Sequence, residues 1–77
     1  MRIFGHGEYI TRLGKADYQS LQTLRINYFV GNGAECTTGI AGGCTVYDLR
    51  EYRQATAEEI VSFLEMEAKA YKQLIER

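Results

Sequence analysis

A chain of 77 residues has room for one small domain, which buries only about 60% of the surface of its unfolded chain and is therefore marginally stable. Nine Lys and Arg residues against ten Asp and Glu residues leave a net charge of -1, which excludes the strong positive field that collects nucleic acid or coats an anionic membrane. The apolar runs are far shorter than the roughly 18 residues of a membrane span, so we expect no transmembrane helix.

The N-terminus consists of a short apolar segment, residues 1–4, and the triplet Gly5-His6-Gly7. It lacks the long apolar segment and the small-residue cleavage site of a secretory signal, so we expect a cytoplasmic protein. His6 has neither a nucleophile nor an orienting acid beside it in the sequence. We therefore interpret it as an exposed side chain rather than a general base.

Two weaker segments precede the first clear strand. Residues 8–13 alternate around Tyr9 and Ile10 and predict one strand, of the kind found at a sheet edge. Residues 17–24 are ambiguous, because Asp17 can begin a helical turn whereas the Tyr and Thr residues of this segment also suit a strand. The segment therefore predicts either a turn of helix or a strand.

Two later segments predict strands with stronger signals. Residues 25–30 and 45–53 are rich in β-branched and aromatic residues, with polar residues at alternate positions. Residues 34–43 between them are rich in Gly and Thr and are too few for a helical crossover. We therefore expect the two strands to form an antiparallel hairpin with a long or distorted loop.

The two cysteines flank the middle of that loop. A hairpin centred near Ile40 would place the thiols of Cys36 and Cys44 opposite each other, at a separation that suits a disulfide. Without a secretion signal, we expect free thiols that pack as small apolar side chains. The remaining candidate zinc ligand, His6, is distant, and no paired-ligand spacing is present, so we predict no metal site.

The glycine-rich segment does not predict a phosphate site. Gly31-Asn32-Gly33 begins like a dinucleotide-binding fingerprint, but the third glycine is missing and no predicted helix follows directly. A P-loop is excluded because no Gly-Lys-Ser or Gly-Lys-Thr sequence follows. The sequence therefore predicts a protein that is not an enzyme, with no catalytic residues and no cofactor.

The C-terminal residues 56–76 predict one long amphipathic helix. Thr56 and Glu59 form the T-x-x-E pattern of a capping box, in which each side chain accepts a hydrogen bond from the backbone N–H of the other. A rotation of about 100° per residue gathers the apolar residues within roughly 160° of arc. These residues are Ile60, Val61, Phe63, Leu64, Ala68, Tyr71, Leu74 and Ile75.

The apolar arc divides into two candidate surfaces. A helix near 30 Å long would extend past a small sheet, so we expect part of its apolar surface to stay uncovered. The side that we expect to pack on the sheet is centred on Ile60, Leu64, Ala68 and Tyr71. The flank that we expect to bind another protein, or a second copy of this one, consists of Phe63, Met66, Glu67, Ala70 and Leu74.

Glu67 is the one acid inside the apolar arc, where an ionised carboxylate is unfavourable unless it finds a partner. One interpretation places it at the solvent-exposed edge of the apolar surface, or in an ion pair with an arginine of the sheet, namely Arg25, Arg50 or Arg53. The other interpretation makes it part of the partner-binding flank.

Arginines and tyrosines recur in the strand-forming segments and suggest an alternative binding surface. An Arg/Tyr face on the sheet could contact a nucleic acid or a protein, with Arg25, Tyr28, Arg50 and Tyr52 as its candidate residues. Base-stacking surfaces normally carry excess positive charge, which this chain lacks. Nucleic-acid binding is therefore the alternative function rather than the favoured one.

Residues 52–60, Tyr-Arg-Gln-Ala-Thr-Ala-Glu-Glu-Ile, carry a resemblance to a known class of proteins. They resemble the ends of many short open reading frames carried by bacteriophages. The resemblance implies a small phage or mobile-element protein, a class that includes anti-CRISPR inhibitors of host defence. Such proteins act in the host cytoplasm by covering the surface of a host protein, without chemistry.

These features together predict a single α+β domain over residues 1–77, with an antiparallel sheet of three or four strands and one long C-terminal helix packed on one face. The expected function is that of a small protein-binding inhibitor or adaptor, which acts on a host protein or as a homodimer. A nucleic-acid-binding or regulatory module is the alternative. A small-ligand site at an oligomer interface is a third class that the sequence leaves open.

Overall fold

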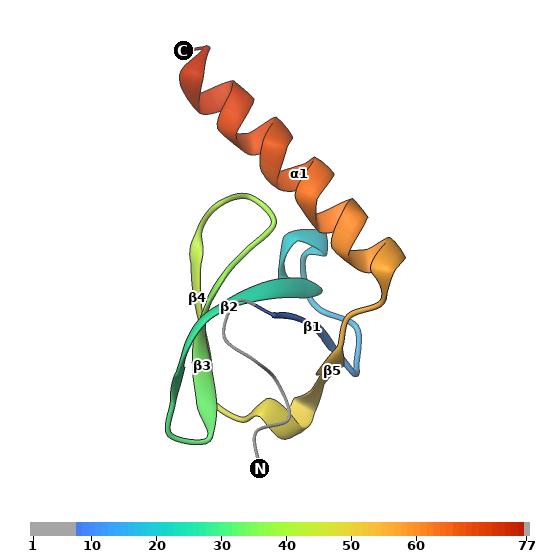
Figure 1. The fold of residues 1–77 in the computed structure, drawn as a ribbon, viewed down its shortest axis with the longest axis vertical. Coiled ribbons are helices and arrows are strands. Elements are labelled where there is room, and N and C mark those ends of the chain that lie inside the picture. The colour runs from blue at the N-terminus through green and yellow to red at the C-terminus, as the bar shows by residue number, and fades with distance from the viewer. Residues whose placement is uncertain (1–7, 77) are drawn as a thin grey trace.

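The computed structural model describes residues 8–76, and it shows an antiparallel sheet beside a long C-terminal helix (Figure 1). The α+β class is as predicted, but the sheet has five strands within the described residues rather than three or four. Residues 1–4 and His6, which the sequence analysis considered, lie outside the described residues. The strands are β1 (Tyr9–Arg12), β2 (Thr23–Val30), β3 (Gly33–Thr37), β4 (Gly43–Val46) and β5 (Tyr52–Gln54); the helix is α1 (Ala57–Ile75), and two 3-10 turns are η1 (Gln19–Leu21) and η2 (Leu49–Glu51).

The strands follow the order β4-β3-β2-β1-β5, and each neighbouring pair is antiparallel. β1 was predicted at a sheet edge, but it lies between β2 and β5. Its central residue Ile10 pairs with Leu24 on one side and Gln54 on the other, and it is fully buried. The edge prediction is wrong because the chain returns after β4 and adds β5 beside β1, a non-local pairing that no local pattern reveals.

The predicted loop of residues 34–43 contains a strand, β3, which lies between β2 and β4, so the predicted direct pairing of the two flanking strands is wrong. β2 turns into β3 through the two residues Gly31 and Asn32, and Gly31 has a φ of 58°. A positive φ at the first position of a two-residue hairpin is typical of a type II′ turn, which glycine adopts without strain. β3 then alternates small buried residues, Ala34 and Cys36, with more exposed polar ones. The loop prediction is wrong because these small residues carry a weak hydrophobic signal.

The segment 45–53 was predicted as one continuous strand, but it is interrupted. β4 ends at Val46, and the Asp48 carboxylate then accepts a 2.9 Å hydrogen bond from the backbone N–H of Arg50 and caps η2. β5 begins only at Tyr52. Aspartate favours caps and turns because its side chain competes for backbone N–H groups. The ambiguous segment 17–24 contains both predicted alternatives, since η1 ends at Leu21 and β2 begins at Thr23.

The main core is formed by the sheet and not by the helix. Along β1 and β2 the side chains alternate, so that Ile10 and Leu24 enter the core whereas Tyr9, Thr11 and Arg25 lie on the side that contacts α1. The buried cluster contains Ile10, Leu24, Ile26, Ala34, Cys36 and Val46, with Phe29, Cys44, Leu49 and Tyr52 packed against it. Every buried member of this cluster therefore belongs to a strand, and none belongs to α1.

The helix begins as predicted but presents an unexpected face to the sheet. The capping box is confirmed, because Thr56 Oγ1 accepts from the Glu59 N–H at 3.2 Å and Glu59 Oε1 accepts from the Thr56 N–H at 2.8 Å. Within α1 the buried residues are Phe63 and Glu67. The C-terminal turns extend well beyond the sheet (Figure 1), in a molecule that measures 42 × 22 × 21 Å.

Candidate functional site

The junction between α1 and the sheet is built around one ion pair. The Arg25 guanidinium donates to both carboxylate oxygens of Glu67, at 2.8 and 2.5 Å, and lies 5.6 Å from the centroid of the Phe63 ring. Phe63 in turn meets the Tyr9 ring edge-on, with the centroids 5.4 Å apart. The hydrogen bond with Glu67 raises the pKa of Arg25 above its ordinary value. The interpretation that pairs Glu67 with Arg25 is therefore confirmed, and these contacts determine the rotation of the helix.

A second polar cluster joins the first turn of α1 to both strands beneath it. Glu59 accepts two 2.8 Å hydrogen bonds from Arg53 of β5 and a 3.2 Å bond from the hydroxyl of Thr11 of β1, besides its capping bond. The bonds from Arg53 and from the Thr56 backbone lower the pKa of Glu59 to about 2. Glu59 is therefore ionised at neutral pH and fully engaged, and we interpret it as a structural residue.

The lowered pKa of Glu59 predicts a specific loss of stability in acid. Because the carboxyl is more acidic in the folded chain than its ordinary value of 4.5, its stabilisation is complete above about pH 5 and is lost as the pH falls towards 2. We expect Glu59→Gln to remove this dependence and to reduce the free energy of unfolding at pH 7 by on the order of 1–2 kcal/mol, allowing for solvent screening. Urea unfolding of both proteins, in steps between pH 7 and pH 2, measures this pH dependence of the free energy of unfolding.

Glu58 provides the matched control for this acid titration. It lies in the same helical turn but is exposed, and its side chain makes no hydrogen bond to the described residues. Glu58→Gln should therefore keep the acid-dependent loss of the parent chain. Equal pH dependence of Glu59→Gln and the parent chain would contradict the assigned role of Glu59.

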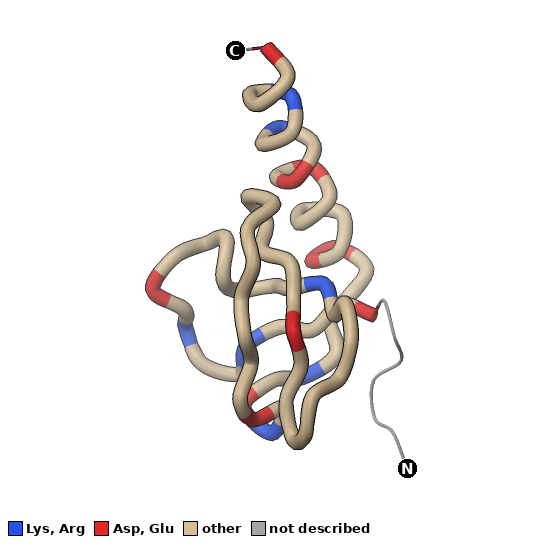
Figure 2. The backbone as a smooth tube through the Cα atoms, turned by 90° about the vertical axis from the view of Figure 1, so that its left-hand side faces the viewer, with Lys and Arg blue, Asp and Glu red and all other residues tan. Residues whose placement is uncertain are grey.

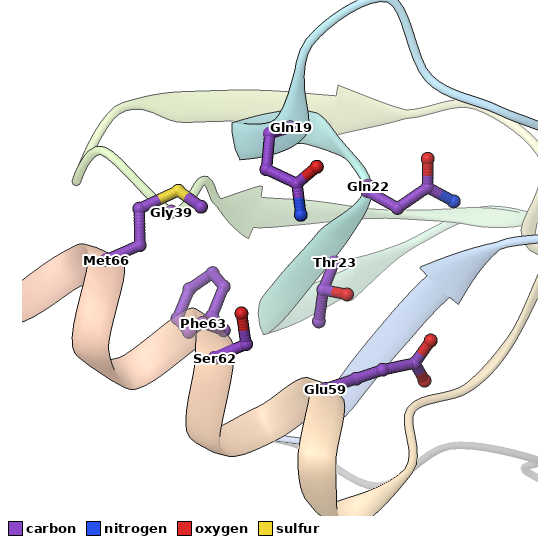
Figure 3. Close-up of a pocket in the computed structure, with 8 residues that line it drawn as sticks. All are labelled: Gln19, Gln22, Thr23, Gly39, Glu59, Ser62, Phe63 and Met66. Carbon is purple, nitrogen blue, oxygen red and sulfur yellow. The ribbon is translucent and has the colours of Figure 1, made fainter.

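A small pocket lies where η1, the start of β2 and the β3–β4 loop meet α1 (Figure 3). Its volume of about 90 Å³ is well below the roughly 300–1,000 Å³ of drug-sized ligand sites. Figure 3 shows the Met66 side chain reaching towards Gly39, where an added Cβ would meet the Met66 sulfur at 2.6 Å. The lining residues are Gln19, Gln22, Thr23, Gly39, Glu59, Ser62, Phe63 and Met66. We interpret this pocket as a packing gap beside the helix.

The cysteines face each other across β3 and β4, as the sequence predicts. Cys36 pairs with Cys44 in the strand register, and both are free thiols. Burial raises the pKa of Cys36 to about 12 and also raises the pKa of Cys44. Because only the thiolate is nucleophilic, Cys36 is unreactive at neutral pH in the folded chain.

An apolar stripe along α1 is left uncovered by the sheet. Its large side chains keep much of their surface in water, with exposed fractions of 54% for Val61, 43% for Leu64, 47% for Tyr71 and 82% for Ile75. A line of exposed apolar side chains on a small protein is a candidate site of interaction. We call this surface the α1 stripe, and it consists of Ala57, Val61, Leu64, Ala68, Tyr71 and Ile75.

The α1 stripe has a regular spacing that the sequence analysis missed. Its residues are separated alternately by four and three positions from Ala57 to Ile75. This is the a/d pattern of a coiled-coil seam, in which a straight line of side chains faces a partner helix. The signal was present in the sequence, but it was hidden within the wider apolar arc.

The predicted roles of the two helix surfaces are corrected by the structure. Phe63 and Glu67, expected to face a partner, are buried against the sheet of the same chain, whereas Met66 and Ala70 are partly covered. Leu74 remains exposed. Leu64, Ala68 and Tyr71, expected to cover the sheet, are exposed, and Ile60 is half-buried. The two surfaces exchange their predicted roles because the ion pair between Arg25 and Glu67 turns the predicted partner-binding flank towards the sheet.

The predicted Arg/Tyr sheet face is not assembled as one surface. Arg25 is bonded to the helix, and Tyr52 packs against the core. Tyr28 is exposed on β2, and Arg50 is exposed but forms an ion pair with its neighbour Asp48. The four candidate residues therefore lie in separate environments.

Comparisons with known proteins add no family or fold relative: no family model, curated protein or solved structure matches the chain. Across residues 8–76, the structure contains no helix whose length and apolar character would let it cross a bilayer. Figure 2 shows acidic and basic residues interspersed over the sheet, without a concentrated basic patch in that view. The α1 stripe is thus the feature on which a functional interpretation can be built.

Proposed function

We propose that this chain is a non-catalytic protein-binding module that uses the α1 stripe as its contact surface. The observation that carries the proposal is the exposure of Val61, Leu64, Tyr71 and Ile75 along one straight line of a capped helix. The opposite flank of the helix is anchored to the sheet through Phe63 and Glu67. The stripe is therefore held in a defined orientation before any partner binds, which reduces the entropic penalty of association.

We further propose that the module acts as an inhibitor or adaptor, in the manner of small phage proteins that cover a host protein. The support for a phage origin is the resemblance carried by residues 52–60. An inhibitor of this type needs a rigid surface and no catalytic group. Occupation of the host surface would by itself block the host protein.

A pull-down from a nuclease-treated bacterial lysate tests the module function. We expect the tagged parent chain to capture a protein and Leu64→Glu to lose it, because the substitution places a charge at the centre of the stripe. Gln73→Glu adds the same charge on the exposed far side of α1 and should keep the capture. Equal capture by the two variants would remove the stripe as the contact surface.

The salt dependence of the same capture separates protein binding from the nucleic-acid alternative. Contact through an apolar stripe should persist as the salt concentration rises, whereas binding to phosphates weakens steeply. The separate environments of Arg25, Tyr28, Arg50 and Tyr52 give the nucleic-acid alternative no common surface among the described residues.

A further inference from the structure

We propose that the protein bound by the α1 stripe is a second copy of this chain, with the two helices antiparallel. This inference rests on the proposed function, because it names the occupant of the same surface. A helix that carries an a/d seam has a preferred partner in another such helix, and the seam of this chain can be tested against itself for size and charge. Both tests favour the antiparallel arrangement.

The first test is the fit of side chains across the seam. In an antiparallel pair with its two-fold axis near Met66, every layer combines a large residue with a smaller one. Ile75 faces Ala57 of the second copy, Tyr71 faces Val61, and Leu64 faces Ala68. Such alternation lets the helices approach to the usual 8–10 Å and fill the space between them. A parallel pair would instead set alanine against alanine in two layers and leave gaps.

The second test is the charge along the flank that points away from the sheet. The flank carries Glu58, Glu65 and Lys72, so that its two acids lie in the first half of α1 and its lysine in the second half. Figure 2 shows the charged positions along the helix. Antiparallel pairing sets Glu58 of each copy against Lys72 of the other, so two opposite-charge contacts form. Glu65 meets its own counterpart near the axis, where Lys69, one turn further on, offsets the repulsion. The antiparallel helix dipoles also attract each other.

The third observation is the flank nearer the sheet. Here antiparallel pairing places Ile60 of one copy beside Leu74 of the other, which covers a leucine that is 51% exposed in the single chain. Glu67 is opposite its counterpart in the pairing, but each carboxylate is buried against its own sheet and bonded to Arg25. The half of α1 that extends beyond the sheet (Figure 1) leaves room for the sheet of the second copy. A host protein that binds the stripe would therefore compete with the second copy.

Sedimentation equilibrium from about 1 µM to about 1 mM tests the self-association, since this range covers weak and moderate dimers. We expect the mass to rise from 8.8 kDa to twice that value. Leu64→Glu should weaken the dimer at least about 100-fold, because the charge is buried twice per dimer, and Gln73→Glu should not. Circular dichroism of each variant confirms that it folds, which is expected because Leu64 and Gln73 lie outside the core.

A charge exchange tests the antiparallel orientation with exposed residues alone. At low salt, Glu58→Lys and Lys72→Glu should each weaken self-association several-fold, because each creates two like-charge contacts. An equimolar mixture of the two variants should recover the affinity of the parent chain, since position 58 of each copy would then face the opposite charge at position 72 of the other. In a parallel pair position 58 does not face position 72, and the mixture would show no recovery.

The results separate this inference from the proposed function. A mass that stays at 8.8 kDa up to about 1 mM overturns the dimer, and the module function survives if Leu64→Glu still abolishes capture of another protein. A dimer that is unaffected by Leu64→Glu overturns the inference too, because it would use another surface. A stripe-dependent dimer with no captured protein supports the inference and removes the inhibitor or adaptor role.

Discussion

Replacement of Arg25 by alanine is expected to reduce the free energy of unfolding by about 3 kcal/mol, within the range for breaking a buried ion pair. The guanidinium holds Glu67, which is 7% exposed, and also covers the Phe63 ring. Without it, a buried carboxylate keeps its desolvation penalty but loses its partner. A domain of this length has only about 4–12 kcal/mol of stability in total, so urea unfolding followed by circular dichroism should detect the change easily.

Two variants control the Arg25 prediction. Arg50→Ala removes a guanidinium that is also in an ion pair, but its side chain is 91% exposed, so we expect a change below about 1 kcal/mol. Glu67→Leu combined with Arg25→Met should recover most of the loss, because apolar replacement of both partners removes the unpaired charge. If Arg25→Ala unfolds at the same urea concentration as the parent chain, the ion pair does not anchor the helix.

Replacement of Gly33 by alanine is expected to reduce the free energy of unfolding by about 3 kcal/mol or more. This is at or beyond the upper end of the usual effect of overpacking. An added Cβ would lie 1.8 Å from the backbone carbonyl oxygen of Val46, and a backbone group cannot rotate away as a flexible side chain can. β3 and β4 would have to separate where Ala34 pairs with Val46, and both of these residues belong to the core. Thermal and urea unfolding measure the loss.

Gly43 offers a matched control on the same pair of strands. An added Cβ at Gly43 meets nothing within 4 Å, and the residue is exposed in β4. Gly43→Ala should therefore stay within about 0.5 kcal/mol of the parent chain, or stabilise it slightly by restricting the unfolded state. Similar losses for the two variants would contradict the close approach of β4 as the reason for the effect at Gly33.

Features that depend on neighbouring residues were predictable from the sequence. The capping box of Thr56 and Glu59 needs only four residues, and its hydrogen bonds form as expected. The strand β2 and its end before Gly31 follow from side-chain shape and from the tendency of glycine to interrupt strands. Strand β3 was missed because its buried residues, Ala34 and Cys36, are small, so burial there depends on the close approach of backbones rather than on a strong apolar pattern.

In the candidate site, too, some features depend on neighbouring residues and others only on tertiary contacts. The apolar arc of α1 and the misplaced charge of Glu67 are both visible in the sequence, and a pairing with Arg25 was among the alternatives. Which side of the arc meets the sheet could not be derived from periodicity, because both sides are apolar. The choice depends on where β1 and β2 place Tyr9 and Arg25, and that depends on the register of a sheet whose pairings are non-local.

Local patterns in the sequence were therefore sufficient to predict the α+β class, the start and amphipathic character of the long helix, strand β2 and the opposition of the two cysteines. Each of these features depends on capping, on side-chain shape or on one short turn. The five-stranded order of the sheet, the interior position of β1 and the rotation of α1 became visible only in the folded chain. They depend on contacts between residues distant in the sequence, above all the ion pair that turns Glu67 inwards and leaves the α1 stripe exposed.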